Sequence, residues 1–304
     1  MMPRFLSIGE CMVELSEAGD GLIRRGFAGD TFNVAYYARK LLPSGWVVSY
    51  LSAVGDDALS GEMLAFMEAS GVDASPVRRI AGKSPGLYLI TLLNGERSFT
   101  YWRDTSAARQ LADDVTHLEE QLAAADVIHV SGITLGILAP AAASHLLQGL
   151  RNARTRGAIV SFDTNYRPRL WQGRNDVQEM FLRAGEVASI VLPGLDDEAL
   201  VFGPCSAADV AGRYRAAGAD VVVVKDGARG AIVFDAAGQT PVPAATPPGL
   251  IDTTAAGDSF AAAFLARFAQ GETAVAAAGF AARVAAEVVS RKGALVPLPP
   301  ELLA

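Results

Sequence analysis

Small residues stand directly before a carboxylate near the end of the chain. In the run Ile251–Phe260, Ala255, Ala256 and Gly257 precede Asp258, and an Ala-rich helical pattern follows. The first N–H groups of a helix have no partner within it and attract anions, so this run predicts a phosphate site. Asp258 fits two roles at this stage: a carboxylate that stabilises the helix end, or a general base beside the phosphate.

A second candidate site is the segment Lys225-Asp-Gly227-Ala-Arg-Gly230, which follows the apolar run VVVV. Open α/β sheets bind ligands at the carboxyl ends of their parallel strands, so the segment suits a nucleotide-binding loop. A tight turn into the next apolar run, AIVF, explains the same glycines.

Short aliphatic runs alternate with longer helical patterns, and this alternation must position both candidates. It predicts an α/β fold with a mostly parallel sheet covered by helices on both faces. The expected strands are Phe5–Ile8, Val47–Val54, Val127–Val130, Ile159–Phe162, Ile190–Leu192, Val221–Val224 and Ile232–Phe234.

Two segments depart from the alternation. The runs Leu87–Leu93 and Arg97–Trp102 flank Asn94-Gly95, a pair that favours a hairpin because both residues tolerate positive φ. A similar pattern spans Cys11–Phe27. We expect a small β-sheet lid from residues of about 11–28 and 86–104, on a single domain of residues 1–304.

Composition limits the classes of function. Half of the 304 residues are hydrophobic (51%) and the formal net charge is −7, which fits a folded protein and disfavours general nucleic-acid binding. Two cysteines and three histidines, without metal-ligand spacing, predict neither a disulfide framework nor a zinc site. The uncharged stretch Val127–Leu150 contains glycines, a proline and histidines, so we expect a strand, a turn and a helix rather than a membrane span. A cytoplasmic protein is the default expectation.

Three segments, in order along the chain, resemble the motifs of the PfkB or ribokinase family of carbohydrate kinases. Gly29-Asp30-Thr-Phe-Asn33 resembles the G-G-x-x-x-N sugar-binding segment, and Val54–Gly61 resembles the G-x-D-x-x-G signature. Asp252–Asp258 resembles the D-T-x-G-A-G-D signature, with Ala255 in place of the first glycine. The resemblance covers nearly the whole chain and implies a ribokinase-like three-layer α/β/α fold.

The resemblance also implies a phosphoryl transfer from ATP with Mg²⁺. It implies that the backbone of Ala255, Ala256 and Gly257 holds the phosphoryl group and that Asp258 deprotonates the acceptor hydroxyl. By the same resemblance, Asp252 supports the turn.

Further family segments imply the nucleotide and metal contacts. Asp163-Thr-Asn165-Tyr-Arg167 matches a D-x-N-x-R segment near the phosphates and substrate, and Lys225, Gly227 and Gly230 fall at the ATP loop. Glu198 matches the acid of an N-x-x-E motif that organises Mg²⁺ through water, although Leu195 occupies the Asn position.

The substrate expectation comes from the lid. Tyr101-Trp-Arg103 resembles a Y-x-R motif of the 2-keto-3-deoxygluconate kinases in this family. A sugar acid needs a cation, and Arg offers a carboxylate a bidentate fork, so Arg103 and Arg167 are candidates. We expect hydrogen bonds to the same ligand from Tyr88 and Tyr101 and from Gly29, Asp30 and Asn33. The expected reaction is phosphorylation of 2-keto-3-deoxy-D-gluconate at its 6-hydroxyl.

Three alternatives stay open. The first is another sugar kinase of the family, such as a fructokinase or ribokinase. The second is a non-catalytic sugar-acid sensor, which Ala255 and Leu195 favour and Asp258, Asn165 and Lys225 disfavour. The third, a dinucleotide-dependent oxidoreductase, is weak because no G-x-G-x-x-G follows the first expected strand. By analogy with other exposed β-lids, we expect a homo-oligomer, a dimer or larger.

Overall fold

An eight-stranded sheet forms the centre of the computed structural model, which describes residues 2–19, 21–93 and 96–303. Its strand order is β14-β13-β12-β11-β10-β9-β1-β4. The strands are β1 (Arg4–Ile8), β4 (Val47–Leu51), β9 (Val127–Ser131), β10 (Ile159–Asp163), β11 (Ile190–Val191), β12 (Val221–Lys225), β13 (Ala231–Asp235) and β14 (Gly238–Val242). From β4 to β12 neighbouring strands are parallel, whereas β13 and β14 are antiparallel additions at one edge.

The sheet is apolar on both faces, which explains its β-branched runs. All five residues of β9 are buried, as are the four valines of β12. Burying one such valine stabilises the fold by roughly 1.5–3 kcal/mol. The parallel sheet and its alternating helices confirm the expected fold class.

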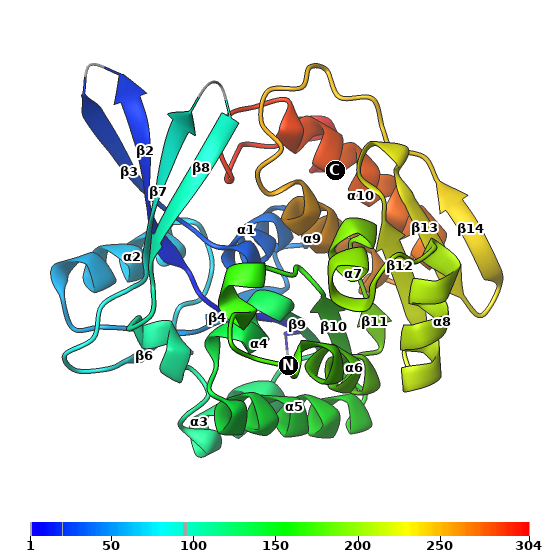
Figure 1. The fold of residues 1–304 in the computed structure, drawn as a ribbon, viewed down its shortest axis with the longest axis horizontal. Helices are drawn as coiled ribbons and strands as arrows, with labels where there is room; N and C mark the ends of the chain where they lie inside the picture. The colour runs from blue at the N-terminus through cyan, green and yellow to red at the C-terminus, as the bar shows by residue number, and fades with distance from the viewer. Residues whose placement is uncertain (1, 20, 94–95, 304) are drawn as a thin grey trace.

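Helices cover the two faces in two separate layers (Figure 1). One layer contains α1 (Asp30–Leu41), α2 (Ala58–Ala69), α9 (Ala256–Phe268) and α10 (Ala274–Val289). The other contains α3 (Val115–Ala123), α4 (Gly132–Ile137), α5 (Pro140–Thr155), α6 (Val177–Val187) and α8 (Ala207–Ala217), and α7 (Leu195–Phe202) packs beside α6 and α8. Helices α1 and α9 lie side by side, which brings their N-terminal turns together.

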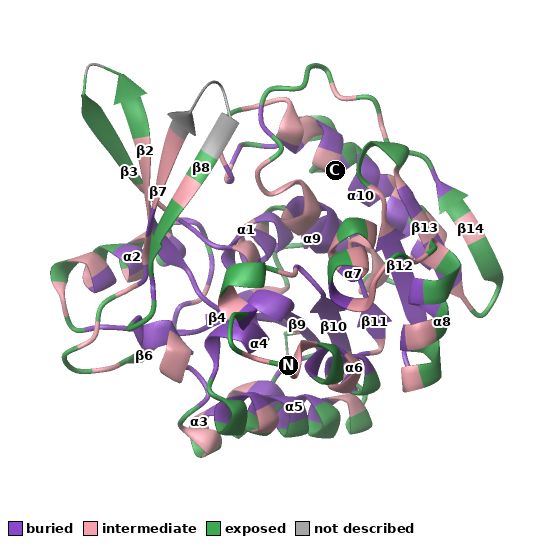
Figure 2. Cartoon of the chain, viewed as in Figure 1, coloured by how far each residue is buried: buried purple, intermediate pink, exposed green. Residues whose placement is uncertain are grey.

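A second, four-stranded sheet rises from one end of the body and forms the predicted lid (Figure 1). It contains β3 (Leu22–Ala28), β2 (Met12–Gly19), β7 (Leu87–Leu93) and β8 (Glu96–Trp102), in that order across the sheet. A short pair, β5 (Ala53–Val54) and β6 (Arg78–Arg79), lies near its base. The far end of β2 and β3 is exposed, whereas their bases are buried (Figure 2). The expected Asn94-Gly95 turn lies outside the described residues.

The uncharged stretch Val127–Leu150 folds as β9, α4 and most of α5. The predicted strand and helix are present, and the short helix α4 takes the place of the predicted turn. Among the described residues, the helices are all too short or too polar to cross a bilayer.

Candidate active site

The N-terminus of α9 begins with a strained turn. Ala255 caps the helix with φ of +61°, in the left-handed region that glycine occupies without strain. Asp252 fastens the turn, because its Oδ1 accepts from the N–H of Thr254 (2.9 Å) and its Oδ2 from the N–H of Gly293 (2.7 Å). These two hydrogen bonds hold the backbone of the turn in place although Ala255 has a side chain in the left-handed region.

Asp258 lies in the first turn of α9 and faces α1. Asn33 donates from Nδ2 to Oδ2 of Asp258 at 2.7 Å. Desolvation, then the negative charge of Asp30, raises the pKa of Asp258 to about 7. A carboxyl group with this pKa can accept and release a proton near neutral pH.

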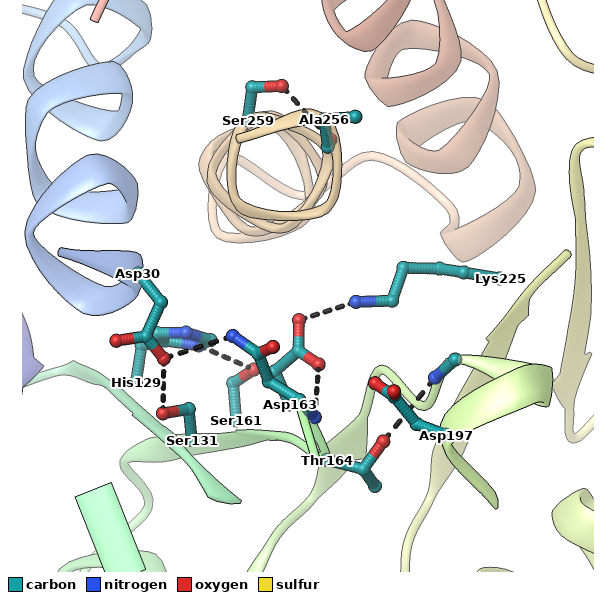
Figure 3. A network of polar contacts seen from close by, with 12 residues as sticks. Asp30, His129, Ser131, Ser161, Asp163, Thr164, Asp197, Lys225, Ala256 and Ser259 are labelled. Carbon is teal, nitrogen blue, oxygen red and sulfur yellow. Dashed lines mark hydrogen bonds and ion pairs between the residues drawn. The ribbon is translucent and has the colours of Figure 1, made fainter. Parts of the chain in front are cut away.

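Asp30, at the start of α1, belongs to a polar network that Figure 3 shows. Oδ2 of Asp30 accepts hydrogen bonds from Ser131 Oγ (2.5 Å) and Asn165 Nδ2 (3.1 Å). Asn165 has φ of +26°, and its own N–H donates to Oδ1 of Asp163. Desolvation raises the pKa of Asp30, since the hydrogen bonds and nearby arginines compensate its charge only in part.

Gly29 is required at the start of α1 by close packing. A Cβ at this position would lie 2.1 Å from the backbone oxygen of Glu10. Its extended backbone is otherwise ordinary, so the contact and not the torsion angle explains the glycine.

Lys225 reaches the α9 turn from the end of β12. Its Nζ donates to Oδ2 of Asp163 and would lie 3.6 Å from a Cβ at Gly257 (Figure 3). A cation and the free N–H groups of a helix N-terminus therefore converge on one place, where an anion can bind.

The loop after Lys225 is a tight turn into β13. The N–H of Asp226 donates to the carbonyl of Gly230, and Gly227 and Gly230 both have positive φ. A Cβ at Gly230 would lie 2.2 Å from the carbonyl oxygen of Val242. The shape of this loop explains both glycines. The loop also holds Lys225 beside the N-terminus of α9.

Arg103 lies at the base of the lid, and Glu10 is its partner. Both Nε and Nη2 of Arg103 donate to Oε2 of Glu10, and the two side chains are 7% and 0% exposed. The charge of Arg103 is thus already compensated within the protein, which the sequence did not indicate.

The predicted tyrosines pair across the lid. Tyr88 on β7 lies opposite Tyr101 on β8, with ring centroids 5.9 Å apart. The hydroxyl of Tyr88 donates to Oε2 of Glu14, and the guanidinium of Arg103 lies 5.8 Å from the Tyr101 ring centroid. The lid therefore presents aromatic rings and paired polar groups at its base.

Arg167 is the more available cation. Its side chain is 51% exposed, and its Nη1 donates to the carbonyl of Tyr166 and lies 3.9 Å from Oδ1 of Asp197. Desolvation raises the pKa of Asp30, and the positive charge of Arg167 opposes this shift in part.

Glu198 does not face this site, and its predicted metal role requires correction. Its fully buried carboxylate accepts hydrogen bonds from Arg213 and from the hydroxyl of Tyr214 (2.7 Å). Desolvation raises the pKa of Glu198 to about 7. This carboxylate joins α7 to α8, because both of its oxygens accept hydrogen bonds from side chains of α8.

The preceding residue, Asp197, faces the site instead (Figure 3). Its Oδ2 accepts from the N–H of Tyr166 at 3.2 Å, and its carboxyl interacts with Arg167, Asp163 and Lys225. Desolvation raises its pKa above the usual value. Within the described part of the chain, acidic, His and Cys side chains do not gather in threes as a ready metal site.

Sequence reasoning named Asp163 only as part of a family segment, and it missed three other residues that the structure brings to the site: Glu10, Glu14 and Asp197. A signal existed for Asp163, since it ends a buried strand beside Asn165 and Arg167. The other three depend on which way a side chain turns at a strand end or in the first turn of a helix, and composition does not encode this.

Comparison with known proteins places the chain among kinases. A model described as "pfkB family carbohydrate kinase" matches residues 2–301. The chain is 41% identical to the 2-dehydro-3-deoxygluconokinase of Escherichia coli K12 over 98% of both chains, and 41% identical to that of Dickeya dadantii over 96% of both. The structure of a fructokinase with bound ATP from Xylella fastidiosa matches with a TM-score of 0.84 and 25% identity, covering 97% of this chain and 94% of that one. With the ribokinase-like fold, the strained turn at Ala255 and the ordered motifs, these matches show that the chain belongs to the PfkB family of carbohydrate kinases.

Proposed function

We propose that the protein phosphorylates 2-keto-3-deoxy-D-gluconate (also named 2-dehydro-3-deoxy-D-gluconate) at its 6-hydroxyl, with ATP as the phosphoryl donor. The observation that carries the chemistry is the position of Asp258, one residue beyond the turn where Lys225 meets Gly257. The relatives named 2-dehydro-3-deoxygluconokinase, with nearly full coverage, support this choice of acceptor.

Asp258 acts as the general base in this proposal. Its unprotonated carboxylate accepts the proton of the 6-hydroxyl while that oxygen attacks the γ-phosphorus of ATP. The bond from the γ-phosphorus to the β–γ bridging oxygen breaks, and ADP leaves. Asn33 holds the carboxylate in place, because its amide donates to one oxygen and leaves the other for the substrate. Fixed orientation supplies much of the rate in phosphoryl transfer.

The α9 turn stabilises the charge that moves. The N–H of Gly257 and the ammonium of Lys225 border the place of the phosphoryl group. The N–H of Ala256 must first leave the carbonyl of Thr253, to which it donates at 3.2 Å. Such preorganised donors stabilise a transition state more than water does. Lys225 must then exchange its bond to Asp163 for one to the phosphate.

In this proposal, the carboxylate end of the substrate lies on the side of the site next to the lid. Arg103 and Arg167 supply the guanidinium groups for its carboxylate, and Asp30 and the Tyr88–Tyr101 pair contact its hydroxyls and chain. A neutral sugar offers no carboxylate to the remaining N–H groups of Arg103 or to the half-exposed Arg167, which disfavours a fructokinase or ribokinase.

The residues around Lys225 fit an ATP–Mg²⁺ complex. Mg²⁺ keeps several water ligands and binds phosphate oxygens with few protein carboxylates, so a ready cage of acids is not needed. Asp163 and Asp197 are the carboxylates beside the phosphate turn that would hold its water shell. When bound, Mg²⁺ neutralises phosphate charge.

The test is a coupled assay for ADP release with 2-keto-3-deoxy-D-gluconate, D-fructose and D-ribose at equal concentration. We expect kcat/KM for the keto acid to exceed that for either neutral sugar by at least about 100-fold, since a site built for a polar group rejects ligands that lack it. A higher value for fructose or ribose would replace the proposal by the corresponding sugar kinase. No ADP release with any of the three would favour the sensor.

Two expectations about the protein in the cell remain proposals. We propose a cytoplasmic location, where ATP and sugar acids are both available. We also propose assembly of identical copies as a dimer or larger, which sedimentation of the purified protein measures directly.

A further inference from the structure

The pair of Glu10 and Arg103 joins the lid to the main sheet. Glu10 stands two residues beyond the end of β1, and Arg103 directly follows the last residue of β8. Both side chains are almost fully buried, so the guanidinium has a fixed place at the base of the lid. Desolvation raises the pKa of Asp30, at the start of α1, and the positive charge of Arg103 opposes this shift in part.

The contact uses only one edge of the guanidinium. Nε and Nη2 donate to the same oxygen, Oε2 of Glu10. An Arg side chain carries five N–H donors in a planar fork, so both hydrogens of Nη1 and one of Nη2 remain. These form the end-on pair that binds a carboxylate with two parallel hydrogen bonds.

The second oxygen of Glu10 is left over. Oε1 is buried and accepts no hydrogen bond within residues 2–19, 21–93 and 96–303. A Cβ at Gly86 would lie 2.6 Å from it, so the backbone of Gly86 packs closely against this oxygen and leaves no room for a side chain there. Buried carboxylate oxygens without donors are rare in folded proteins, so the hydrogen bonds of Glu10 itself do not explain its place here, whereas its contact with Arg103 does.

We propose that Glu10 determines specificity for the acid end of the substrate. Its Oε2 holds Arg103 so that the Nη1–Nη2 fork meets the ligand carboxylate. This inference rests on the proposed function, because it names how the same site selects a sugar acid.

The experiment compares two substrates that differ only at the acid end. These are 2-keto-3-deoxy-D-gluconate and 3-deoxy-D-fructose, which has a hydroxymethyl group in place of the carboxylate. The variants are Glu10→Asp, which keeps the charge and shortens the side chain, and Glu62→Gln as a matched control. Glu62 also pairs a helix with the lid, through Arg25, but this pair is exposed.

For Glu10→Asp we expect KM for the keto acid to rise between about tenfold and a hundredfold, because the fork moves by about 1 Å. KM for ATP, kcat/KM for 3-deoxy-D-fructose and the melting temperature stay near wild type. Glu62→Gln leaves all four unchanged. Equal losses on both substrates would reduce Glu10 to a structural residue and overturn the inference.

A double substitution covers the case in which Glu10→Asp does not fold. Glu10→Gln with Arg103→Gln removes both buried charges together. On the keto acid, this double variant is expected to lose no more than Arg103→Gln alone. Additive losses would show that the two residues act independently and would overturn the inference. If the wild type itself does not phosphorylate the keto acid, the proposed function fails, which is a different outcome from either of these.

Discussion

Asn33 on α1 donates to the carboxylate of Asp258 on α9 at 2.7 Å, across 225 positions of sequence. This bond connects the segment that resembles a sugar-binding motif with the segment that resembles a phosphoryl-transfer motif. It fixes the carboxylate between the two.

Asp258→Asn removes the proposed base and keeps its size. We expect kcat to fall by a factor of about 10²–10⁴, the usual contribution of general acid–base catalysis, with KM for the keto acid nearly unchanged. A coupled ADP assay measures it. Turnover within about threefold of wild type would refute the role of Asp258 as base.

The activity should depend on pH through Asp258. Its pKa of about 7 means that the base is half protonated at neutral pH, so kcat rises as pH increases through about 7. Asp30→Asn removes a negative charge that raises this pKa, and we expect the midpoint of the residual activity to move to lower pH. A midpoint that stays in place would show that Asp30 does not set the pKa.

The same raised pKa has a consequence for stability. Because the folded state binds this proton more tightly than the unfolded state, the carboxyl contributes stability that is fully present below its unfolded pKa. That contribution is lost as pH rises through about 7. Thermal unfolding of Asp258→Asn should therefore vary less with pH, between about 4 and 7, than that of the wild type.

Ala255→Gly tests the strained turn. An L-residue at φ of +61° is unfavourable, and glycine relieves this, so we expect a gain of about 1 kcal/mol in the free energy of unfolding. The melting temperature should rise by about 1–2 °C. Calorimetry measures the melting temperature of both proteins. A lower value for Ala255→Gly would mean that the packing of the alanine side chain contributes more stability than its strain removes.

The adjacent acids of α7 should separate structure from metal dependence. Glu198→Gln leaves Arg213 without its buried partner and is expected to cost about 3 kcal/mol of stability, with the Mg²⁺ dependence of the surviving activity unchanged. Asp197→Asn is expected to raise the Mg²⁺ concentration needed for half-maximal activity and to change stability less. The reverse pattern would return the metal role to Glu198.

Lys225→Met removes the cation from the phosphate turn. We expect kcat to fall by about 10²–10³, as for the loss of one transition-state donor, and KM for ATP to rise. KM for the keto acid is the internal control, since Lys225 lies on the phosphate side. An unchanged kcat would mean that Lys225 only pairs with Asp163 and does not stabilise the phosphoryl group.

The sequence by itself determined the layers of the fold and the principal site segments. Periodic apolar runs, the small-residue turn before Asp258 and the two lid patterns are local features, and each is encoded within a dozen residues. The order of the three motifs along the chain indicated the PfkB family.

Only the tertiary structure decided which partners these residues meet. Arg103 looked like an uncommitted cation until the fold placed Glu10 against it, and Glu198 looked like a metal acid until the start of α7 turned it toward Arg213. Such pairings depend on helix rotation and on the meeting of distant strand ends. Packing of the whole core fixes these features, and local spacing does not.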